Sequence, residues 1–214
     1  MSSGRVRLTP GYRWIMAILR AWSLLLWPLR VEGREHLPEV GGALLVANHS
    51  SVLDITGMAL ASLPRHASFV ARRSLSDSRF LERVLDTSEA ILIEPGASDR
   101  AALRQIVERL REGRLVAIFP EGTRSPDGAL HPFKGGALLA ARMAGVPLIP
   151  CGVSGAWEAW PRHRRWPRRG PVLVRFGAPL EPDLEDLGEV LEHQVSQLAG
   201  IERAPSGEDA SPPS

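Results

Sequence analysis

The pattern of apolar and polar residues along the chain predicts short strands that alternate with helices. Apolar runs of about four to eight residues, bounded by glycine, proline or polar residues, are typical of buried strands. Such runs lie at residues 43–47, 67–71, 90–93, 115–119, 146–153 and 172–176. Segments typical of helices lie between and after them, at residues 55–63, 80–85, 98–111, 135–144 and 184–198. The alternation predicts an α/β fold, with a mixed, largely parallel sheet flanked by helices.

The most apolar long segment, Tyr12–Leu29, precedes this alternating region. Only about 14 residues separate Arg13 from Pro28, and as a helix they would measure about 21 Å, against roughly 30 Å for the hydrocarbon core of a bilayer. Arg13 and Arg20 are seven positions apart and share one helical face, opposed by Trp, Ile and Leu. No small-residue cleavage site of a signal peptide follows. We predict an N-terminal amphipathic membrane-interface helix; the alternative is a helix that packs on the domain core.

Length and composition indicate one globular domain with an appendage at each end. The chain has 214 residues, of which 44% are hydrophobic and 23% are charged, as in folded rather than disordered proteins. We predict an interfacial helix over residues 1–30, an α/β domain over 31–202 and a disordered, Pro/Ser/Asp-rich tail over 203–214.

Charge and tryptophan are concentrated in two regions of the chain. The net charge is only +2, and no recognised nucleic-acid fold surrounds the basic residues, so we expect no nucleic-acid partner. Basic residues gather in the first thirty positions and at 162–169, and the six tryptophans lie in the same two regions: Trp14, Trp22, Trp27, Trp157, Trp160 and Trp166. Trp beside Arg is typical of a membrane–water interface. We therefore expect membrane lipids as partners; a solvated basic loop is the alternative for 157–169.

The single cysteine, Cys151, excludes an internal disulfide, which fits a reducing compartment. Because Cys151 lies within an apolar run, we interpret it as a small core residue rather than a catalytic thiol. No Cys/His spacing resembles a zinc site, and we expect no metal ion.

Candidate chemistry lies where the predicted strands end. In α/β sheets, active sites form in the loops that follow the carboxyl ends of the strands. That rule selects residues 48–54, 120–125 and 151–155.

The first of these loops carries His49 and Asp54. Ser51 and Asp54 have the spacing of a capping box, with Ser51 as the N-cap. The positive end of the helix would keep His49 neutral and able to accept a proton, and Asp54 could fix its tautomer and stabilise the imidazolium. Since the pair includes no protein nucleophile, a substrate alcohol would supply one. The alternative is that Asp54 is only a cap and His49 only a loop residue.

The second loop, Phe119–Ser125, combines turn-forming Pro and Gly with hydrogen-bond donors. Thr123 and Arg124 can donate to an anion, and Arg124 can hold a phosphate bidentately. Lys134 can add positive charge nearby. The alternative is an ordinary loop with an ion pair between Glu121 and Arg124.

Together, the two loops resemble the motifs of the glycerolipid acyltransferases, the family that includes 1-acylglycerol-3-phosphate acyltransferase. Asn-His-x-x-x-x-Asp stands at 48–54, and Phe-Pro-Glu-Gly-Thr-Arg-Ser follows at 119–125. Shorter matches lie at residues 31–38, 126–128, 133–136 and 146–150, so that the resemblance covers roughly residues 31–180. It implies that the α/β domain predicted over 31–202 is an acyltransferase domain.

The resemblance implies roles for individual residues. His49 matches the family's catalytic base, and Asp54 matches the residue that orients it. The motif implicated in binding the acceptor's phosphate corresponds to Glu121, Gly122, Thr123 and Arg124. The resemblance implies no metal and no bound cofactor, with acyl-CoA or acyl carrier protein (acyl-ACP) as the acyl-carrying co-substrate.

Two departures from the family pattern concern the acceptor. The family commonly carries an Arg just after an apolar strand, where this chain has Ile91–Glu94 followed by Pro95, with Arg100 as the candidate substitute. The Lys usually found near the preceding strand is represented by Arg72 or Arg73.

From these observations we expect a membrane-associated acyltransferase of phospholipid biosynthesis. It would move a fatty acyl group from acyl-CoA or acyl-ACP to the hydroxyl of lysophosphatidic acid, forming phosphatidic acid. Further acceptors stay open, namely another lysophospholipid, glycerol 3-phosphate or a lyso-aminolipid. A non-enzymatic lipid-binding membrane module and a soluble enzyme whose Trp/Arg segments bind a protein partner also stay open at this point. The expected location is the cytoplasmic face of the cell membrane, peripheral or monotopic.

Overall fold

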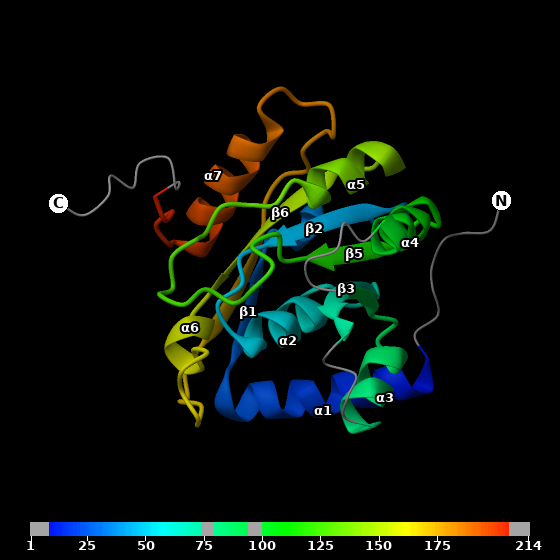
Figure 1. Ribbon diagram of the computed structural model, residues 1–214. Coiled ribbons are helices and arrows are strands. Elements are labelled where there is room, and N and C mark those ends of the chain that lie inside the picture. Colours follow the sequence, from blue (N-terminus) through cyan, green and yellow to red (C-terminus); the bar gives the residue numbers. More distant parts are fainter. Residues whose placement is uncertain (1–8, 74–78, 94–99, 206–214) are drawn as a thin grey trace.

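A seven-stranded sheet in the order β1-β7-β6-β2-β5-β3-β4 forms the centre of the molecule (Figure 1). The computed structural model describes residues 9–73, 79–93 and 100–205. The strands are β1 (Leu29–Glu32), β2 (Ala43–Ala47), β3 (Ala67–Arg72), β4 (Ile91–Ile93), β5 (Leu115–Ile118), β6 (Leu148–Ser154) and β7 (Val172–Phe176). Strands β2 to β6 run parallel, whereas β7 is antiparallel to β6 and parallel to β1. The predicted mixed, largely parallel α/β sheet is confirmed.

Helices cover both faces of the sheet. They are α1 (Pro10–Leu26), α2 (Val52–Ala61), α3 (Arg79–Thr87), α4 (Arg100–Arg111), α5 (Gly136–Ala144), α6 (Ala156–Ala159) and α7 (Leu187–Ala199), with a short 3-10 turn, η1, at Arg34–His36. The buried residues of α1, α2 and α6 share one hydrophobic cluster, and those of α4, α5 and α7 share a second on the opposite face.

Strand β2 divides its side chains between the two clusters. Leu45 and Ala47 belong to the α1/α2 cluster, and Leu44 and Val46 belong to the other. All of β2 is buried, as expected for a central parallel strand covered on both sides. The carboxyl end of β2 therefore opens in the middle of the sheet edge, where the loop with His49 begins.

Strand β1 and helix α6 are the elements that the apolar pattern did not predict. The residues of β1 alternate between half-buried and exposed, as in an edge strand, and α6 is only four residues long. The helix predicted over Tyr12–Leu29 ends at Leu26, because the chain turns there and enters β1. The predicted boundary between the N-terminal helix and the α/β domain, at residues 30 and 31, therefore falls inside a strand.

Helix α1 has an inner face in the core and an apolar outer face. Tyr12, Met16 and Ser23 are buried against the domain. The outer face exposes five large apolar side chains: Trp14, Ile18, Trp22, Leu24 and Leu25. Trp14, for example, is 73% exposed. Within the described residues, no helix is long and apolar enough to cross a bilayer. The predicted helix exists, it packs on the core, and it also presents an apolar surface outward.

The first residues of the predicted C-terminal tail are ordered against the domain. Leu130 donates from its backbone amide to the carbonyl of Glu202 and accepts from the amide of Ala204, both at 2.8 Å. The part of that prediction that concerns residues 206–214 lies outside the described residues.

Candidate active site

The three loops selected from the sequence meet at the carboxyl edge of β2, β5 and β6. The side chain of Asn48 exchanges two hydrogen bonds with the backbone of Val153, at 2.9 and 2.8 Å. The amide of Ser125 donates to the carbonyl of His49 at 2.7 Å. Residues 151–154, which were selected as part of a loop, belong to β6. The loop after β2 is thus joined to the end of β6 and to the loop after β5, and the position of His49 depends on both.

His49 and Asp54 form a hydrogen-bonded pair. Nδ1 of His49 lies 3.0 Å from Oδ2 of Asp54, which also accepts from the amides of Ser50 and Ser51 at 2.6 and 2.7 Å. Because Oδ2 of Asp54 already accepts from two backbone amides, it faces Nδ1 as an acceptor, and Nδ1 donates to it. Nε2 then has a free lone pair, and 14% of the His49 side chain is exposed to solvent. This is the tautomer that a general base needs.

The position of Asp54 is compatible both with a role as a helix cap and with the predicted role as the partner of His49. Helix α2 begins with the predicted capping box, in which Ser51 accepts from the amide of Leu53 at 3.2 Å while Asp54 accepts from the amide of Ser51. One carboxylate oxygen therefore starts the helix and orients the imidazole.

Two aromatic rings support His49 from the side. The ring of Phe119 stacks on the imidazole at a centroid distance of 4.2 Å and an angle of 19°, and Phe69 stacks behind Phe119 at 6.3 Å. From the sequence, Phe119 was the first residue of the second motif and Phe69 a strand residue, and neither ring was assigned a role beside His49. The signal that could have identified Phe119 is its place at the end of β5, opposite the loop that follows β2.

Glu121 lies under the loop, within the protein. It is 6% exposed, and its two oxygens accept from the amide of His49 at 2.6 Å and the amide of His131 at 3.2 Å. Burial raises the pKa of Glu121 to about 7, although the bonds from His49 and His131 lower it. The ion pair with Arg124, which was the alternative interpretation of this loop, is not among the salt bridges of the described residues. The role of Glu121 in phosphate binding stays a prediction.

Gly122 brings a lysine to the loop. Its φ of +73° is in the left-handed region, and a Cβ there would lie 2.7 Å from Nζ of Lys134. Thr123 is exposed and Arg124 half-buried in the following turn. The Lys134 amide also donates to the carbonyl of Pro120 at 3.1 Å. A glycine is needed here because a side chain would both strain the backbone and displace the lysine.

The residues that depart from the family pattern are exposed or lie outside the described part of the chain. Glu94 and Pro95 lie outside the described residues, as does the side chain of Arg72. Arg100 is exposed at the first position of α4, and Arg73 is exposed after β3. The substitution of Arg100 for the family's Arg stays a prediction.

Cys151 is fully buried in β6, and burial raises the pKa of its thiol far above the ordinary value. An inert core thiol, as interpreted from the sequence, agrees with this position. Among the described residues, no group of three or more His, Cys, Asp or Glu side chains could hold a metal ion.

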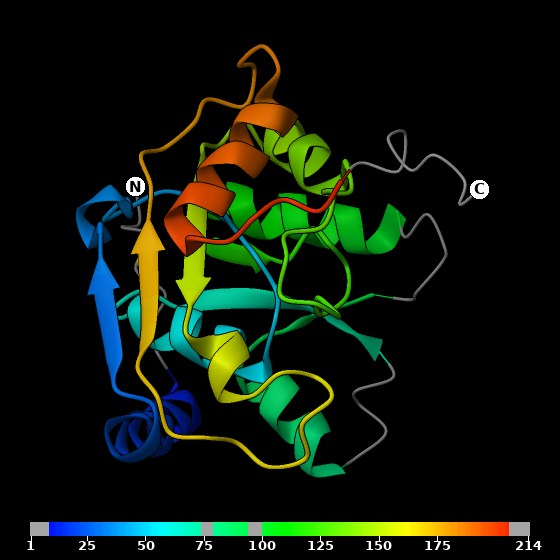
Figure 2. The ribbon, with the colours of Figure 1, turned by 90° about the vertical axis from the view of Figure 1, so that its left-hand side faces the viewer.

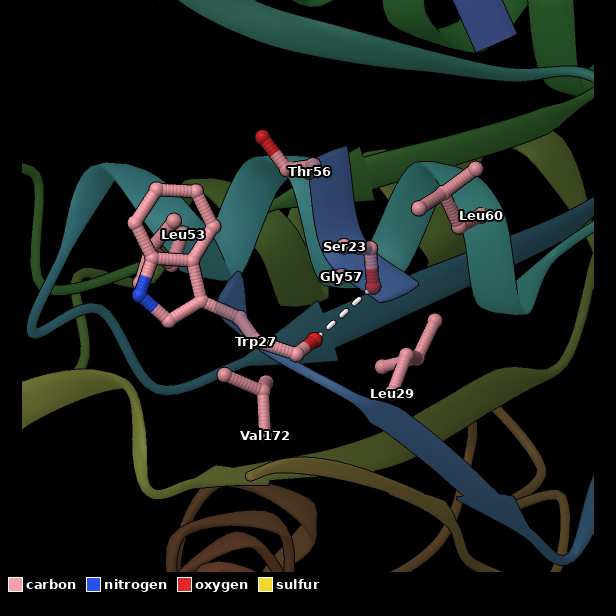
Figure 3. A pocket seen from close by; sticks show the side chains of 8 residues that line it. All are labelled: Ser23, Trp27, Leu29, Leu53, Thr56, Gly57, Leu60 and Val172. Atoms are coloured by element: carbon pink, nitrogen blue, oxygen red, sulfur yellow. Dashed lines mark hydrogen bonds between the residues drawn. The ribbon is translucent and has the colours of Figure 1, made fainter. Parts of the chain in front are cut away.

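A small apolar groove lies between α1, α2 and the start of β7 (Figure 3). Its empty volume is about 230 Å³. The lining side chains are Ser23, Trp27, Leu29, Leu53, Thr56, Gly57, Leu60 and Val172. The hydroxyl of Ser23 donates to the carbonyl of Trp27 at 2.8 Å, so the groove's polar groups are largely satisfied internally. Neither His49 nor Asp54 is among these lining residues.

A His–Asp pair at a strand end, with cationic side chains on the neighbouring loop, has the geometry expected of an enzyme that activates an acceptor alcohol. Within the described part of the chain, Asp54 is the only hydrogen-bond partner of the His49 ring, and no described hydroxyl or thiol contacts it. The chain belongs to the acyltransferase family, whose model matches residues 28–154.

Relatives of known name support this membership. The chain is 26% identical over 169 residues to the 1-acyl-sn-glycerol-3-phosphate acyltransferase of Bacillus subtilis, covering 79% of this chain and 82% of that protein. It is 32% identical over 181 residues to the alpha form of that enzyme from Ovis aries, covering 78% of this chain and 63% of the relative. The crystal structure of the 1-acyl-sn-glycerophosphate acyltransferase PlsC from Thermotoga maritima matches with a TM-score of 0.75 and 27% identity, covering 88% of this chain and 79% of that one. The α/β fold and the acyltransferase class inferred from the motifs are confirmed.

Proposed function

We propose that the protein transfers a fatty acyl group from a thioester, acyl-CoA or acyl-ACP, to the free hydroxyl of lysophosphatidic acid, so that phosphatidic acid is formed. The observation that carries the proposal is the His49–Asp54 pair beside a loop with two cationic side chains, Arg124 and Lys134. The names of the relatives agree with this acceptor.

In the proposed reaction, Nε2 of His49 takes the proton of the acceptor hydroxyl as its oxygen attacks the thioester carbonyl. The imidazolium is stabilised by Asp54 across 3.0 Å. When the tetrahedral intermediate collapses, the carbon–sulfur bond breaks, and the leaving thiolate takes the proton from His49. The acyl group ends as an ester on the acceptor, and His49 returns to its neutral form.

The amides that could bind the oxyanion of that intermediate are limited by the hydrogen bonds of the loops. The amides of His49, Ser50 and Ser51 already donate to the carboxylates of Glu121 and Asp54. Among the described residues, the amides of Thr123 and Arg124 have no hydrogen-bond acceptor. These two amides follow the left-handed Gly122, and we assign to them a negatively charged oxygen of the reactants.

The phosphate of the acceptor is assigned to the same loop. Arg124 supplies a planar pair of donors, Thr123 supplies a hydroxyl, and Lys134 supplies a second positive charge over Gly122. Since the phosphate and the reacting hydroxyl belong to one small glycerol backbone, a phosphate held here brings that hydroxyl toward His49.

We also propose that the protein works as a peripheral or monotopic protein at the cytoplasmic face of the membrane. Two exposed segments support this. The outer face of α1 is apolar, and the loop between α6 and β7, residues 160–171, carries Arg162, Arg164, Arg165, Arg168 and Arg169 together with Trp166, which is 72% exposed. Both segments lie at one end of the molecule in Figures 1 and 2.

Contacts join these two segments into one surface. Nε1 of Trp27 donates to the carbonyl of Arg168 at 2.8 Å, and the ring of Trp27 stacks on Trp160 at 6.1 Å. The amide of Gly170 donates to the carbonyl of Leu26 at 3.2 Å. An apolar strip beside a basic loop suits the boundary between acyl chains and anionic headgroups.

The test of the reaction is an acceptor and donor panel with the purified protein. Lysophosphatidic acid, another lysophospholipid, glycerol 3-phosphate and a lyso-aminolipid are each offered with acyl-CoA and with acyl-ACP. We expect the highest kcat/KM with lysophosphatidic acid. A higher kcat/KM for another acceptor would reassign the substrate, and no transfer to any hydroxyl would refute the proposal.

A further inference from the structure

The carboxylate of Glu121 bridges two histidine backbones that are far apart in the sequence. Oε1 accepts from the amide of His49 at 2.6 Å, and Oε2 accepts from the amide of His131 at 3.2 Å. Because the side chain is 6% exposed and each oxygen is engaged, the carboxylate faces the protein interior. A negative group in this position is also unsuited to contact an anionic phosphate.

The backbone of His49 is held on both sides by the loop that follows β5. Its amide is bonded to Glu121, and its carbonyl accepts from the amide of Ser125 at 2.7 Å. The imidazole is then fixed by Asp54 and Phe119. If the bond to Glu121 is lost, the ring keeps these contacts, but the peptide that carries the ring can tilt.

We propose that Glu121 is a positioning residue that holds the backbone of the base His49 and links it to His131, and that it does not contact the acceptor. This inference rests on the proposed function only for the role of His49 as the base. The link to His131 continues outward, because Nε2 of His131 lies 3.0 Å from Oδ1 of Asp127, which also accepts from the hydroxyl of Ser125 at 3.0 Å.

Protonation of Glu121 would weaken the link. Burial raises the pKa of this carboxyl to about 7. Among the charged groups around it, Asp54 raises the pKa of Glu121 and His131 lowers it. Two further titratable side chains are close in the loops: His49, whose amide bonds to Glu121, and Lys134, whose Nζ lies over Gly122. The protonated acid has an O–H in place of one acceptor and can no longer accept from both amides. The link is therefore complete well above pH 7 and is lost as the pH falls through about 7.

Glu121→Gln tests the kinetic role, because glutamine has the same shape but only one acceptor, as in the protonated acid. At pH 8.5 we expect kcat to fall on the order of ten- to a hundredfold, as for a small misplacement of a catalytic group, with the KM for lysophosphatidic acid within twofold of wild type. Glu108→Gln, at an exposed position of α4, is the matched control. A raised acceptor KM with unchanged kcat would mean that Glu121 contacts the substrate, and unchanged kinetics would mean that it does nothing for His49.

A second measurement does not depend on activity, and its decisive arm uses the wild type. The chain has six histidines, so protein labelled with 15N-histidine gives six backbone amide signals. In the wild type, two of them, those of His49 and His131, should shift with a common midpoint near pH 7, and in Glu121→Gln neither should show that midpoint. Absence of a shared midpoint in the wild type would overturn the inference, whatever acceptor the enzyme uses.

Discussion

At the scale of single residues, the site depends on carboxylates that serve more than one neighbour. Oδ2 of Asp54 accepts from two amides and from His49, and Glu121 accepts from two amides in different loops. The Asp54 contacts were predictable because they are local: a capping box brings residues three apart together, and His49 lies just before it. The contact between Glu121 and His49 spans 72 residues, and only the pairing of β2 with β5 produces it, so no local pattern could indicate it.

Replacement of His49 by alanine should abolish transfer and leave the fold intact. The ring is partly exposed and is held by its stacking on Phe119 and its bond to Asp54, so its removal should leave the fold intact. Loss of a general base costs on the order of 10²–10⁴ in rate. The measurement is the kcat of purified His49→Ala, with His193→Ala, exposed on α7, as the control and the melting temperature as the check on folding. More than a tenth of wild-type turnover in a folded His49→Ala protein contradicts the mechanism.

Asp54→Asn separates capping from catalysis. The amide oxygen of asparagine can still accept from the backbone of Ser50 and Ser51, so α2 should keep its N-cap. A neutral side chain does not stabilise an imidazolium, so we expect kcat to fall on the order of 10²–10⁴ while the melting temperature changes by a few degrees at most. Asp86→Asn, at an exposed position of α3, serves as the control. Normal turnover would show that Asp54 is only a cap.

Arg124→Ala should raise the KM for a phosphate-bearing acceptor and leave the KM of the thioester nearly unchanged. A lost charge-assisted contact is worth roughly 1.5–3 kcal/mol, which corresponds to about a ten- to hundredfold change; the lower end is expected because Arg124 is only half-buried. Lys134→Ala should act in the same direction and more weakly, since its side chain is exposed. Arg104→Ala on α4 is the control. If only the donor's KM responds, the loop binds the donor's phosphates instead.

At the scale of elements, the predictable parts are those with a strong local pattern. The central strands were predicted because both of their faces are buried, which makes them continuous apolar runs. The start of β1 was assigned to the preceding apolar helix, because these alternating residues form a strand only by pairing with β7, which is far away in the sequence. Helix α6 has four residues and no apolar period to detect.

The packing of β6 against α7 offers a stability test at this scale. A Cβ on Gly152 would clash with the backbone of Leu198 and Ala199 in α7, so the helix would have to move away from the sheet. Gly152→Ala should lower the free energy of unfolding by about 1–3 kcal/mol, as overpacking does. Gly135→Ala is the matched control, since nothing lies within 4 Å of its Cβ position and its φ of −65° suits alanine. Denaturant unfolding of the two variants checks this, and equal stabilities would contradict the close approach.

At the scale of the whole molecule, attachment to a bilayer is the testable property. Vesicles with and without anionic lipid are sedimented with the wild type and with a variant in which Arg162, Arg164, Arg165, Arg168 and Arg169 are replaced by glutamine. Each basic residue near an anionic surface adds about 1 kcal/mol. We expect the variant to bind anionic vesicles much more weakly at low salt, and both proteins to bind neutral vesicles equally through α1. Equal binding of the two proteins to anionic vesicles would exclude the loop from the contact.

The reversed direction of β7 determines which segments lie beside the site and so how a lipid substrate would reach it. Because β7 is antiparallel to β6 and parallel to β1, the amino ends of β1 and β7 lie at the same sheet edge as the carboxyl ends of β2, β5 and β6. The end of α1 and the basic loop, which lead into those two strands, therefore share one edge with His49. A docked molecule would meet its acceptor by lateral diffusion within the leaflet, without extraction of the lipid into water. The turnover of the enzyme would then depend on the mole fraction of the acceptor in the bilayer, as in surface-dilution kinetics, and not on the bulk concentration of the acceptor.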